Sequence, residues 1–155
     1  MITGKKFAAE ALVFVGYPSM FYRHPKLGQN IKWFDCSGFV WFLLKKLKFP
    51  FDKRLRHTNE FFDRLGVFIH EECADKGDLV FWSWDGLVPR HVGVMLSATE
   101  YVHAPGRDKT FVSVAKLKTQ KTPINSSLKN QIYFHNPIGY KRLAVRVGRY
   151  QKIIE

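Results

Sequence analysis

Residues 35–46 read DCSGFVWFLLKK, and this stretch carries the clearest helix signal in the chain. We predict a helix over residues 37–47, because it follows Asp35, has lysines where the negative end of the helix dipole falls, and is stopped by Pro50. Cys36 then stands at or just before the first turn, where unpaired backbone N–H groups favour negative charge. A thiolate in such a place has a lowered pKa and is the reactive form of cysteine. Cys36 is therefore a candidate nucleophile, although packing inside a helix is the commoner fate of a cysteine.

The rest of the chain divides into a helical half and a half of short strands. In the first half we predict two further helices, over residues 5–15 and 58–64, and an irregular loop over 20–34. The second half contains β-type runs over residues 78–84, 91–96, 101–104 and 110–114, an exposed loop over 116–130, and one or more closing strands within 138–150. Helices first and strands later predict an α+β fold, in which N-terminal helices pack on an antiparallel β-sheet.

Length and composition fit a single domain over residues 1–155. Hydrophobic residues make up 46% of the chain, which is enough for a core. The longest apolar run, Phe39–Leu44, is too short to span a bilayer, and no secretory signal peptide is recognisable at the N-terminus. We therefore expect a protein without a membrane span that is cytoplasmic, is exported or delivered by a non-classical route, or has already lost a leader. We also expect a monomer.

The chain is strongly basic, since 25 Lys and Arg residues against 13 Asp and Glu residues give a net charge of +12. A field of this sign attracts polyanions, so nucleic acid, anionic lipid and anionic cell-wall polymer are all compatible partners. A basic nucleic-acid-binding module is the alternative to an enzyme, and it predicts binding that collapses steeply with salt. The sequence has no recognition motif of a known nucleic-acid module, so we expect no nucleic-acid partner.

A cysteine nucleophile needs a base within hydrogen-bond reach and a third group that orients the base. His91 begins one β-type run, and His103 lies in the next. The two runs predict a hairpin in which His103 lies beside His91 and fixes its tautomer, although this depends on the strand register. A zinc site built from Cys36, Cys73, His91 and His103 lacks the usual ligand spacing, so we expect no metal and no cofactor.

Four motifs stand in order along the chain: Asp35-Cys36-Ser37-Gly38-Phe39-Val40, Lys76-Gly77-Asp78-Leu79-Val80-Phe81, His91-Val92-Gly93-Val94 and Val102-His103-Ala104. Their order and spacing resemble the NlpC family of cell-wall peptidases. The segment Gly139-Tyr140-Lys141-Arg142 is similar to the closing strand of that family. The resemblance implies a papain-like cysteine peptidase fold.

The resemblance also implies an activity, namely hydrolysis of amide bonds in the stem peptides of bacterial peptidoglycan or in muropeptides. The scissile bond is typically the one between D-glutamate and the diamino acid. The implied catalytic triad is Cys36, His91 and His103, which would act through a thioester acyl-enzyme. A fold and a nucleophile fix a reaction type and not a substrate, so another amidase, an acyltransferase or a deamidating effector remains open.

Four further residues are candidates for binding the substrate. In the family, the residues on either side of the cysteine help to bind the amino end of the substrate, which implies that role for Asp35 and Ser37. An upstream tyrosine often lies near the oxyanion position, and here Tyr17 and Tyr22 are both candidates. The chain has Phe21-Tyr22-Arg23-His24-Pro25 where the family has Tyr-x-x-Gly-Gly, so the substrate pocket is where this chain departs from the family pattern.

Overall fold

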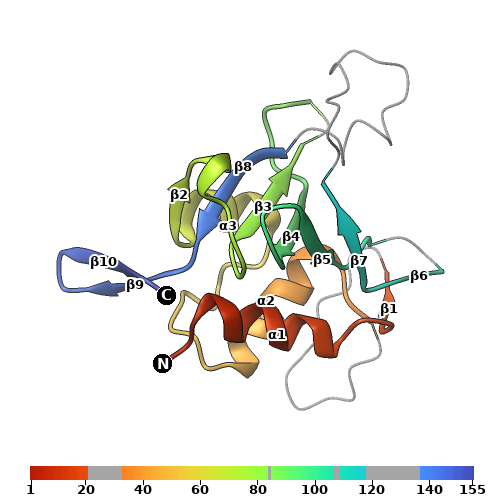
Figure 1. The fold of residues 1–155 in the computed structure, drawn as a ribbon, viewed down its shortest axis with the longest axis horizontal. Helices are drawn as coiled ribbons and strands as arrows, with labels where there is room; N and C mark the ends of the chain where they lie inside the picture. Colours follow the sequence, from red (N-terminus) through yellow and green to blue (C-terminus); the bar gives the residue numbers. More distant parts are fainter. Residues whose placement is uncertain (21–32, 84, 107–108, 118–136) are drawn as a thin grey trace.

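A six-stranded antiparallel sheet forms the centre of the protein in a computed structural model (Figure 1), which describes residues 1–20, 33–83, 85–106, 109–117 and 137–155. Its strands stand in the order β2-β8-β3-β4-β5-β7. They are β2 (Val67–Ile69), β3 (Leu79–Trp82), β4 (His91–Met95), β5 (Glu100–His103), β7 (Ser113–Lys116) and β8 (Pro137–Arg142). Two small sheets add β1 (Pro18–Ser19) with β6 (Thr110–Phe111), and β9 (Ala144–Val147) with β10 (Tyr150–Ile153).

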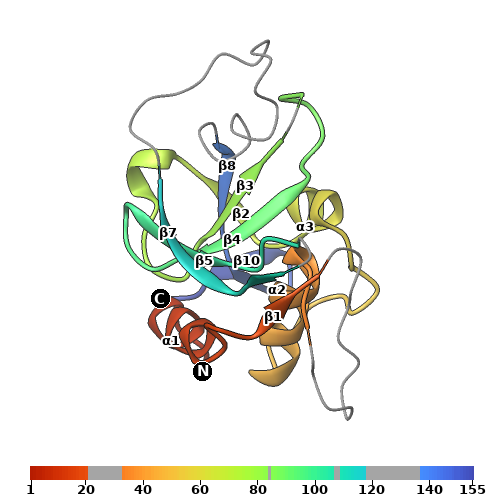
Figure 2. The same ribbon diagram turned by 90° about the vertical axis from the view of Figure 1, so that its right-hand side faces the viewer.

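The helices of the described residues are α1 (Gly4–Val13), α2 (Cys36–Lys46), α3 (Thr58–Arg64) and the short 3-10 helix η1 (Glu71–Cys73). Helices α1 and α2 lie on the same side of the sheet (Figure 2). Apolar side chains of both helices pack there against alternate residues of β3, β4 and β5 and form the main core. On the opposite face, Val80, Trp82, Met95 and Tyr101 of these strands form part of a second, smaller cluster. The predicted α+β architecture is confirmed.

Helix α2 is the most buried of these helices, and each of its ends is defined by a specific interaction. Asp35 is the N-cap, and its carboxylate accepts a hydrogen bond from the Gly38 N–H at 2.7 Å. At the other end, the Phe49 N–H donates to the Leu44 carbonyl at 2.8 Å, as in a Schellman motif. Lys48 has a φ of 55° there, in the left-handed region that favours glycine. The apolar run between the two ends is therefore fixed in place as one buried helix.

Most predicted elements occur in the structure, but the predicted strand over residues 110–114 is wrong. The segment forms two strands, β6 and β7, which belong to different sheets. Val112 lies between them, donates its N–H to the Tyr17 carbonyl and accepts a hydrogen bond from the Gly16 N–H, so it is tied to the segment after α1. Short elements such as β2 and η1 were not predicted. The predicted loops over 20–34 and 116–130 lie largely outside the described residues.

None of the helices in the described ranges has the length and the hydropathy needed to cross a bilayer.

A bidentate ion pair ties β8 to the start of β3. Arg142 donates from Nε to Asp78 Oδ1 and from Nη2 to Asp78 Oδ2, both at 2.8 Å. Asp78 is almost fully buried and also accepts a hydrogen bond from the Asp75 N–H. Its side chain raises the pKa of Arg142 above the usual range, first through this hydrogen bonding. The pair therefore fixes the start of β3. Strand β4 pairs with β3, so the position of the residues at the start of β4 depends on this ion pair as well.

Replacing Asp78 with asparagine (Asp78→Asn) should lower the free energy of unfolding by about 2 kcal/mol, because the Arg142 guanidinium loses its buried counter-charge. Urea unfolding followed by circular dichroism measures this loss. Asp52→Asn is the matched control, since Asp52 pairs with Arg54 at the surface and such pairs contribute little. Equal losses in the two variants would contradict the prediction.

Candidate active site

The Cys36 thiol lies against the backbone at the start of β4. Cys36 is the first residue of α2, and its Sγ is 3.8 Å from the carbonyl oxygen of Arg90. The backbone of Val92 also hydrogen-bonds to this thiol. Arg90 and Val92 flank His91 in the sequence, so the packing of α2 on β4 brings the predicted nucleophile to the stretch of backbone that carries the predicted base.

His91 and His103 contact each other directly. The distance between His91 Nε2 and His103 Nδ1 is 2.7 Å, and the two ring planes are nearly perpendicular, at 88°. Strands β4 and β5 pair in the register Val94 to Val102, which places the two histidines at diagonal positions on one face of the sheet. The predicted hairpin is confirmed, and its register brings the His91 and His103 rings together.

The histidine pair is enclosed by the sheet. His91 is 1% exposed and His103 is 6% exposed. The Trp82 ring packs against His91 with 5.4 Å between ring centroids, and the Tyr101 ring packs against His103 at 5.1 Å. Burial lowers the pKa of His103 to about 4. His103 is therefore a neutral imidazole at neutral pH.

The electrostatics of Cys36 differ from the prediction made from its place at a helix start. Burial, and next the negative charge of Asp35, raise the pKa of Cys36 to about 11. Hydrogen bonds from Thr58 and from the backbone of Val92 and Ser37 act in the opposite direction but do not outweigh burial. The raised pKa runs against the low-pKa thiolate that the helix start predicts, and it favours the neutral thiol at neutral pH.

Thr58 is a site residue that the sequence analysis missed. It is the first residue of α3, it is 6% exposed, and its Oγ1 lies 3.5 Å from Cys36 Sγ. It lies 22 positions from Cys36, and a threonine at the start of a helix normally indicates only a helix terminus. Its proximity to the thiol arises from tertiary packing, for which the sequence offers no local signal.

The structure gives the predicted substrate-binding residues different environments. Asp35 and Ser37 are buried beside Cys36, and the Asp35 carboxylate is used as the helix cap. Tyr17 is exposed, and its ring lies 6.1 Å from that of Phe34, two residues before the nucleophile. Tyr22 lies outside the described residues. The roles of these residues in binding a substrate remain predictions.

Within the described ranges, no three His, Cys, Asp or Glu side chains are grouped so that they could hold a metal ion. Cys36 and Cys73 are both free cysteines, and Cys73 is exposed.

These features define a class of protein, because a cysteine at the start of a buried helix, set against a strand that carries a paired histidine, is the arrangement of papain-like cysteine hydrolases. A model of the NlpC/P60 family matches residues 22–144, which is most of the chain. The protein therefore belongs to the NlpC/P60 family. No curated protein matches it.

Solved structures of this family share the fold. NlpC1 from Trichomonas vaginalis has a TM-score of 0.62 and 16% identity, with 92% of this chain and 45% of that one covered. An NlpC/P60 family protein from Bacillus cereus has a TM-score of 0.63 and 22% identity, with 92% and 40% covered. The NlpC/p60 domain of the peptidoglycan hydrolase SagA has a TM-score of 0.55 and 29% identity, with 74% and 90% covered. The chain thus spans less than half the length of the first two proteins.

Iodoacetamide should alkylate Cys36 slowly at neutral pH, with a rate that keeps rising into the alkaline range, because only the thiolate reacts and the thiol pKa is about 11. Mass spectrometry of the labelled peptides measures the rate at each pH. Cys73 is the internal control, since it is exposed and should be labelled first. A rate for Cys36 that reaches its plateau near neutral pH would instead indicate a thiolate–imidazolium pair.

The free energy of unfolding should fall by about 2 kcal/mol between pH 7 and pH 5 on account of His103. Its folded pKa of about 4 lies below the unfolded value of 6.5, so the unfolded state binds more protons and stability is lost as the pH falls below 6.5. Urea unfolding at the two pH values measures the loss. The variant His103→Asn should lose less stability over this interval, and an unchanged pH dependence in that variant would exclude His103 as the cause.

Proposed function

We propose that the protein is a cysteine peptidase or amidase that hydrolyses amide bonds in peptidoglycan stem peptides. The observation that carries the proposal is the 2.7 Å contact between His91 and His103, at the start of the strand whose backbone contacts the Cys36 thiol. Membership of the NlpC/P60 family and similarity to a domain of a peptidoglycan hydrolase support hydrolase chemistry. Cys36 is the nucleophile, His91 the general base and acid, and His103 the residue that orients His91.

The proposed proton transfer depends on the tautomers of the two histidines. For His91 to act as the base, His103 carries its proton on Nε2 and accepts, on Nδ1, a hydrogen bond from the His91 Nε2–H, one of the two donor assignments that fit the 2.7 Å contact. The lone pair of His91 is then on Nδ1, which is the nitrogen that receives the thiol proton. In the opposite tautomer, His91 Nδ1 would carry a hydrogen and could not act as a base. When His91 becomes protonated, its Nε2–H still donates to His103, which stabilises the imidazolium.

The proposed reaction has two halves. In the first, the Cys36 proton moves to His91 as Sγ bonds to the substrate carbonyl carbon, and N–H groups at the start of α2 stabilise the oxyanion. The C–N bond then breaks, His91 protonates the leaving amine, and a thioester remains on Cys36. In the second half, His91 takes a proton from water, the hydroxide attacks the thioester, and the acid leaves as Cys36 regains its proton. Because burial raises the Cys36 pKa, we propose that proton transfer accompanies attack and does not precede it.

The proposed scissile bond is the one between D-glutamate and the diamino acid of the stem peptide. This choice rests on the family resemblance of the four motifs. Asp35 supplies a carboxylate that suits the ammonium group at the amino end of such a peptide, and Ser37 lies beside the nucleophile in the sequence. Tyr17 or Tyr22 is the proposed hydroxyl near the oxyanion.

Replacing the nucleophile (Cys36→Ala) should abolish cleavage of muropeptides, with a loss of at least about 10⁴-fold in kcat, while the fold is retained. Mass spectrometry of peptidoglycan digests identifies the bond that only the unmodified protein cleaves. Cys73→Ala is the matched control and should retain activity, since Cys73 is exposed on η1. Equal digestion by Cys36→Ala would refute the assignment, and transfer or deamidation products would identify a different acyl chemistry on the same residues.

The two histidines should differ in their effect on activity. His91→Ala should lower kcat more than His103→Ala, for which we expect a loss of about a hundredfold, because a base is harder to replace than the group that orients it. His103→Asn should retain more activity than His103→Leu, since an amide oxygen can still accept the His91 Nε2–H. Steady-state kinetics on a defined stem peptide tests both comparisons. A larger loss in His103→Ala than in His91→Ala would mean that the roles are exchanged.

A further inference from the structure

The β9–β10 hairpin is a feature that the proposed hydrolase function does not use. It begins at the last residue that matches the family model, and it projects from the body of the protein (Figure 1). Its turn contains Gly148, whose φ of 59° suits a tight two-residue hairpin turn. Val147 is 56% exposed and Tyr150 is 80% exposed, and the register places them opposite each other. The hairpin therefore presents apolar surface to solvent at its outer end.

A cavity of about 510 Å³ lies beside this hairpin. Its walls come from the start of α1, the segment that follows α2 and the two hairpin strands. The apolar side chains that line it include Ile2, Leu47, Phe49, Val145 and Val147. A volume of this size lies within the range of sites that hold small organic ligands. Its lining suits a hydrocarbon chain.

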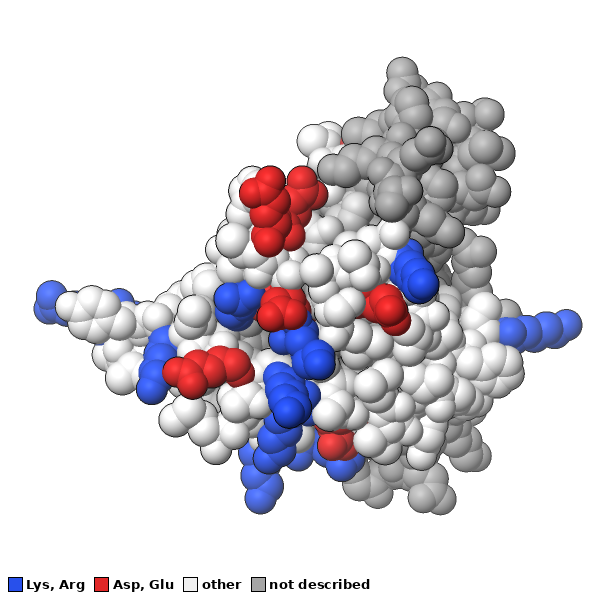
Figure 3. Space-filling view, viewed as in Figure 1, with Lys and Arg blue, Asp and Glu red and all other residues white. Residues whose placement is uncertain are grey.

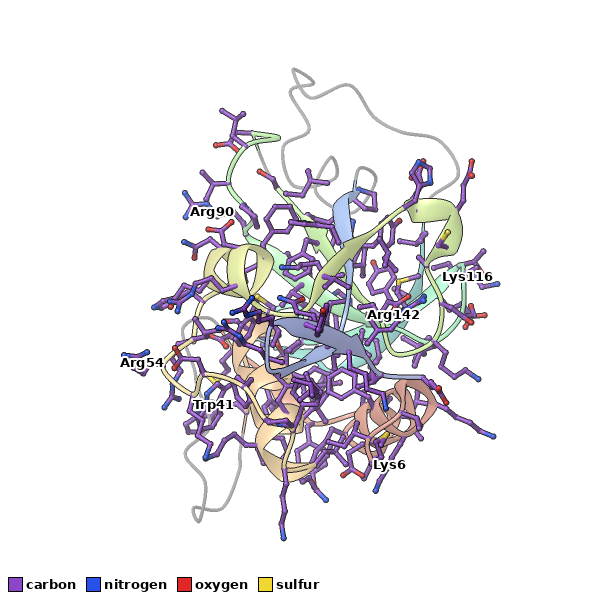
Figure 4. All side chains as sticks on the ribbon, turned by 90° about the vertical axis from the view of Figure 1, so that its left-hand side faces the viewer. Lys6, Trp41, Arg54, Arg90, Lys116 and Arg142 are labelled. Carbon is purple, nitrogen blue, oxygen red and sulfur yellow. The ribbon has the colours of Figure 1, made fainter. Side chains whose placement is uncertain are left out.

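Three lysines, Lys6, Lys48 and Lys152, also line this cavity, whereas none of its lining residues is acidic. Within the described part of the chain, the structure gives none of these ammonium groups an ion-pair partner. Figure 4 looks at this end of the molecule and shows Lys6 on α1, below the hairpin. Figure 3 shows further basic side chains at the outer end of the hairpin, which carries Arg146 and Arg149. The cavity thus combines an apolar interior with a cationic surround.

Lys48 is an independent observation in favour of a binding role. It occupies the left-handed position after α2, with a φ of 55°, where glycine is the usual residue. A residue with a side chain is disfavoured there, and such conformations are often retained where the side chain has a function. In this protein the position places a lysine in the lining of the cavity.

We propose that this end of the molecule binds the surface of an anionic phospholipid bilayer, with the cavity taking an acyl chain and the lysines contacting the phosphate groups. Apolar side chains flanked by Lys and Arg are the surface that a negatively charged membrane interface attracts. A second copy of the chain is a poor occupant, because a symmetric contact would bring these basic groups against one another. A nucleic acid is also a poor occupant, because its phosphate backbone could contact the lysines but would leave the apolar lining of the cavity unfilled.

The proposed lipid site is separate from the candidate active site. Cys36 begins α2, whereas Lys48 follows its other end, and a helix of eleven residues is roughly 16 Å long. Substitutions around the cavity should therefore change membrane binding without changing cleavage of small soluble muropeptides. The two proposals can fail independently.

Vesicle co-sedimentation of the full chain tests the proposal, with phosphatidylcholine vesicles compared with vesicles that also contain phosphatidylglycerol. We expect binding only to the anionic vesicles, and weaker binding as salt increases. The double variant Lys48→Gln/Lys152→Gln should weaken binding at least about tenfold. A second variant, Val147→Asn/Tyr150→Ser, should weaken it while the charge is unchanged. The matched control is Lys53→Gln/Lys116→Gln, which removes the same charge away from the cavity and should bind nearly as the unmodified protein does.

Several outcomes would overturn the proposal. One is the absence of binding, or equal binding to neutral and anionic vesicles. Another is an equal loss of vesicle binding in Lys48→Gln/Lys152→Gln and in the control variant, which would show that binding depends only on the net charge of the protein. A dimer in light scattering that Val147→Asn/Tyr150→Ser converts to monomer would assign the face to a second copy of the chain. Melting temperatures of all variants show whether weaker binding reflects unfolding.

Discussion

The packing of α2 against the central sheet is the constraint on which the other features depend. This helix is apolar on nearly all sides, so it must be buried, and the face of β3, β4 and β5 that α1 also covers is where it is buried. Its position then determines what lies at its two ends. At the first end, the Cys36 thiol contacts the backbone of β4 around His91. At the second end, the turn through Lys48 forms one wall of a cavity.

The same burial controls the protonation of the candidate catalytic groups. A charged side chain is costly where water is excluded, and this raises the pKa of the Cys36 thiol and lowers that of His103. Both residues are then neutral before substrate binds. The charges needed for the proposed chemistry form only during the reaction, at the point where the helix dipole and the histidine pair can stabilise them.

Helix boundaries and hairpins that depend on local sequence patterns could be predicted here, and they agree with the structure. The boundaries of α2 follow from Asp35, an apolar run and terminal lysines, and the β4–β5 hairpin follows from two short runs with a small connection. Features that depend on tertiary contacts could not be predicted. Thr58 reaches Cys36 only because α3 folds back toward α2, and the split between β6 and β7 results from hydrogen bonds of Val112 to the segment after α1. The rise in the Cys36 pKa could not be predicted either, because helix position is visible in the sequence and the surroundings of the thiol in the fold are not.

Asp35 has two effects that act against each other. As the N-cap of α2 it accepts the Gly38 N–H and so stabilises the start of the helix that the core depends on. As a negative charge next to Cys36 it makes the thiolate less favourable. The same carboxylate therefore anchors the helix and makes the Cys36 thiol less reactive. A substrate with a cationic amino end would neutralise the carboxylate and so make the thiolate more favourable. In that case the substrate itself would help to activate the cysteine that attacks it, and peptides without a free amino end would meet a less reactive enzyme.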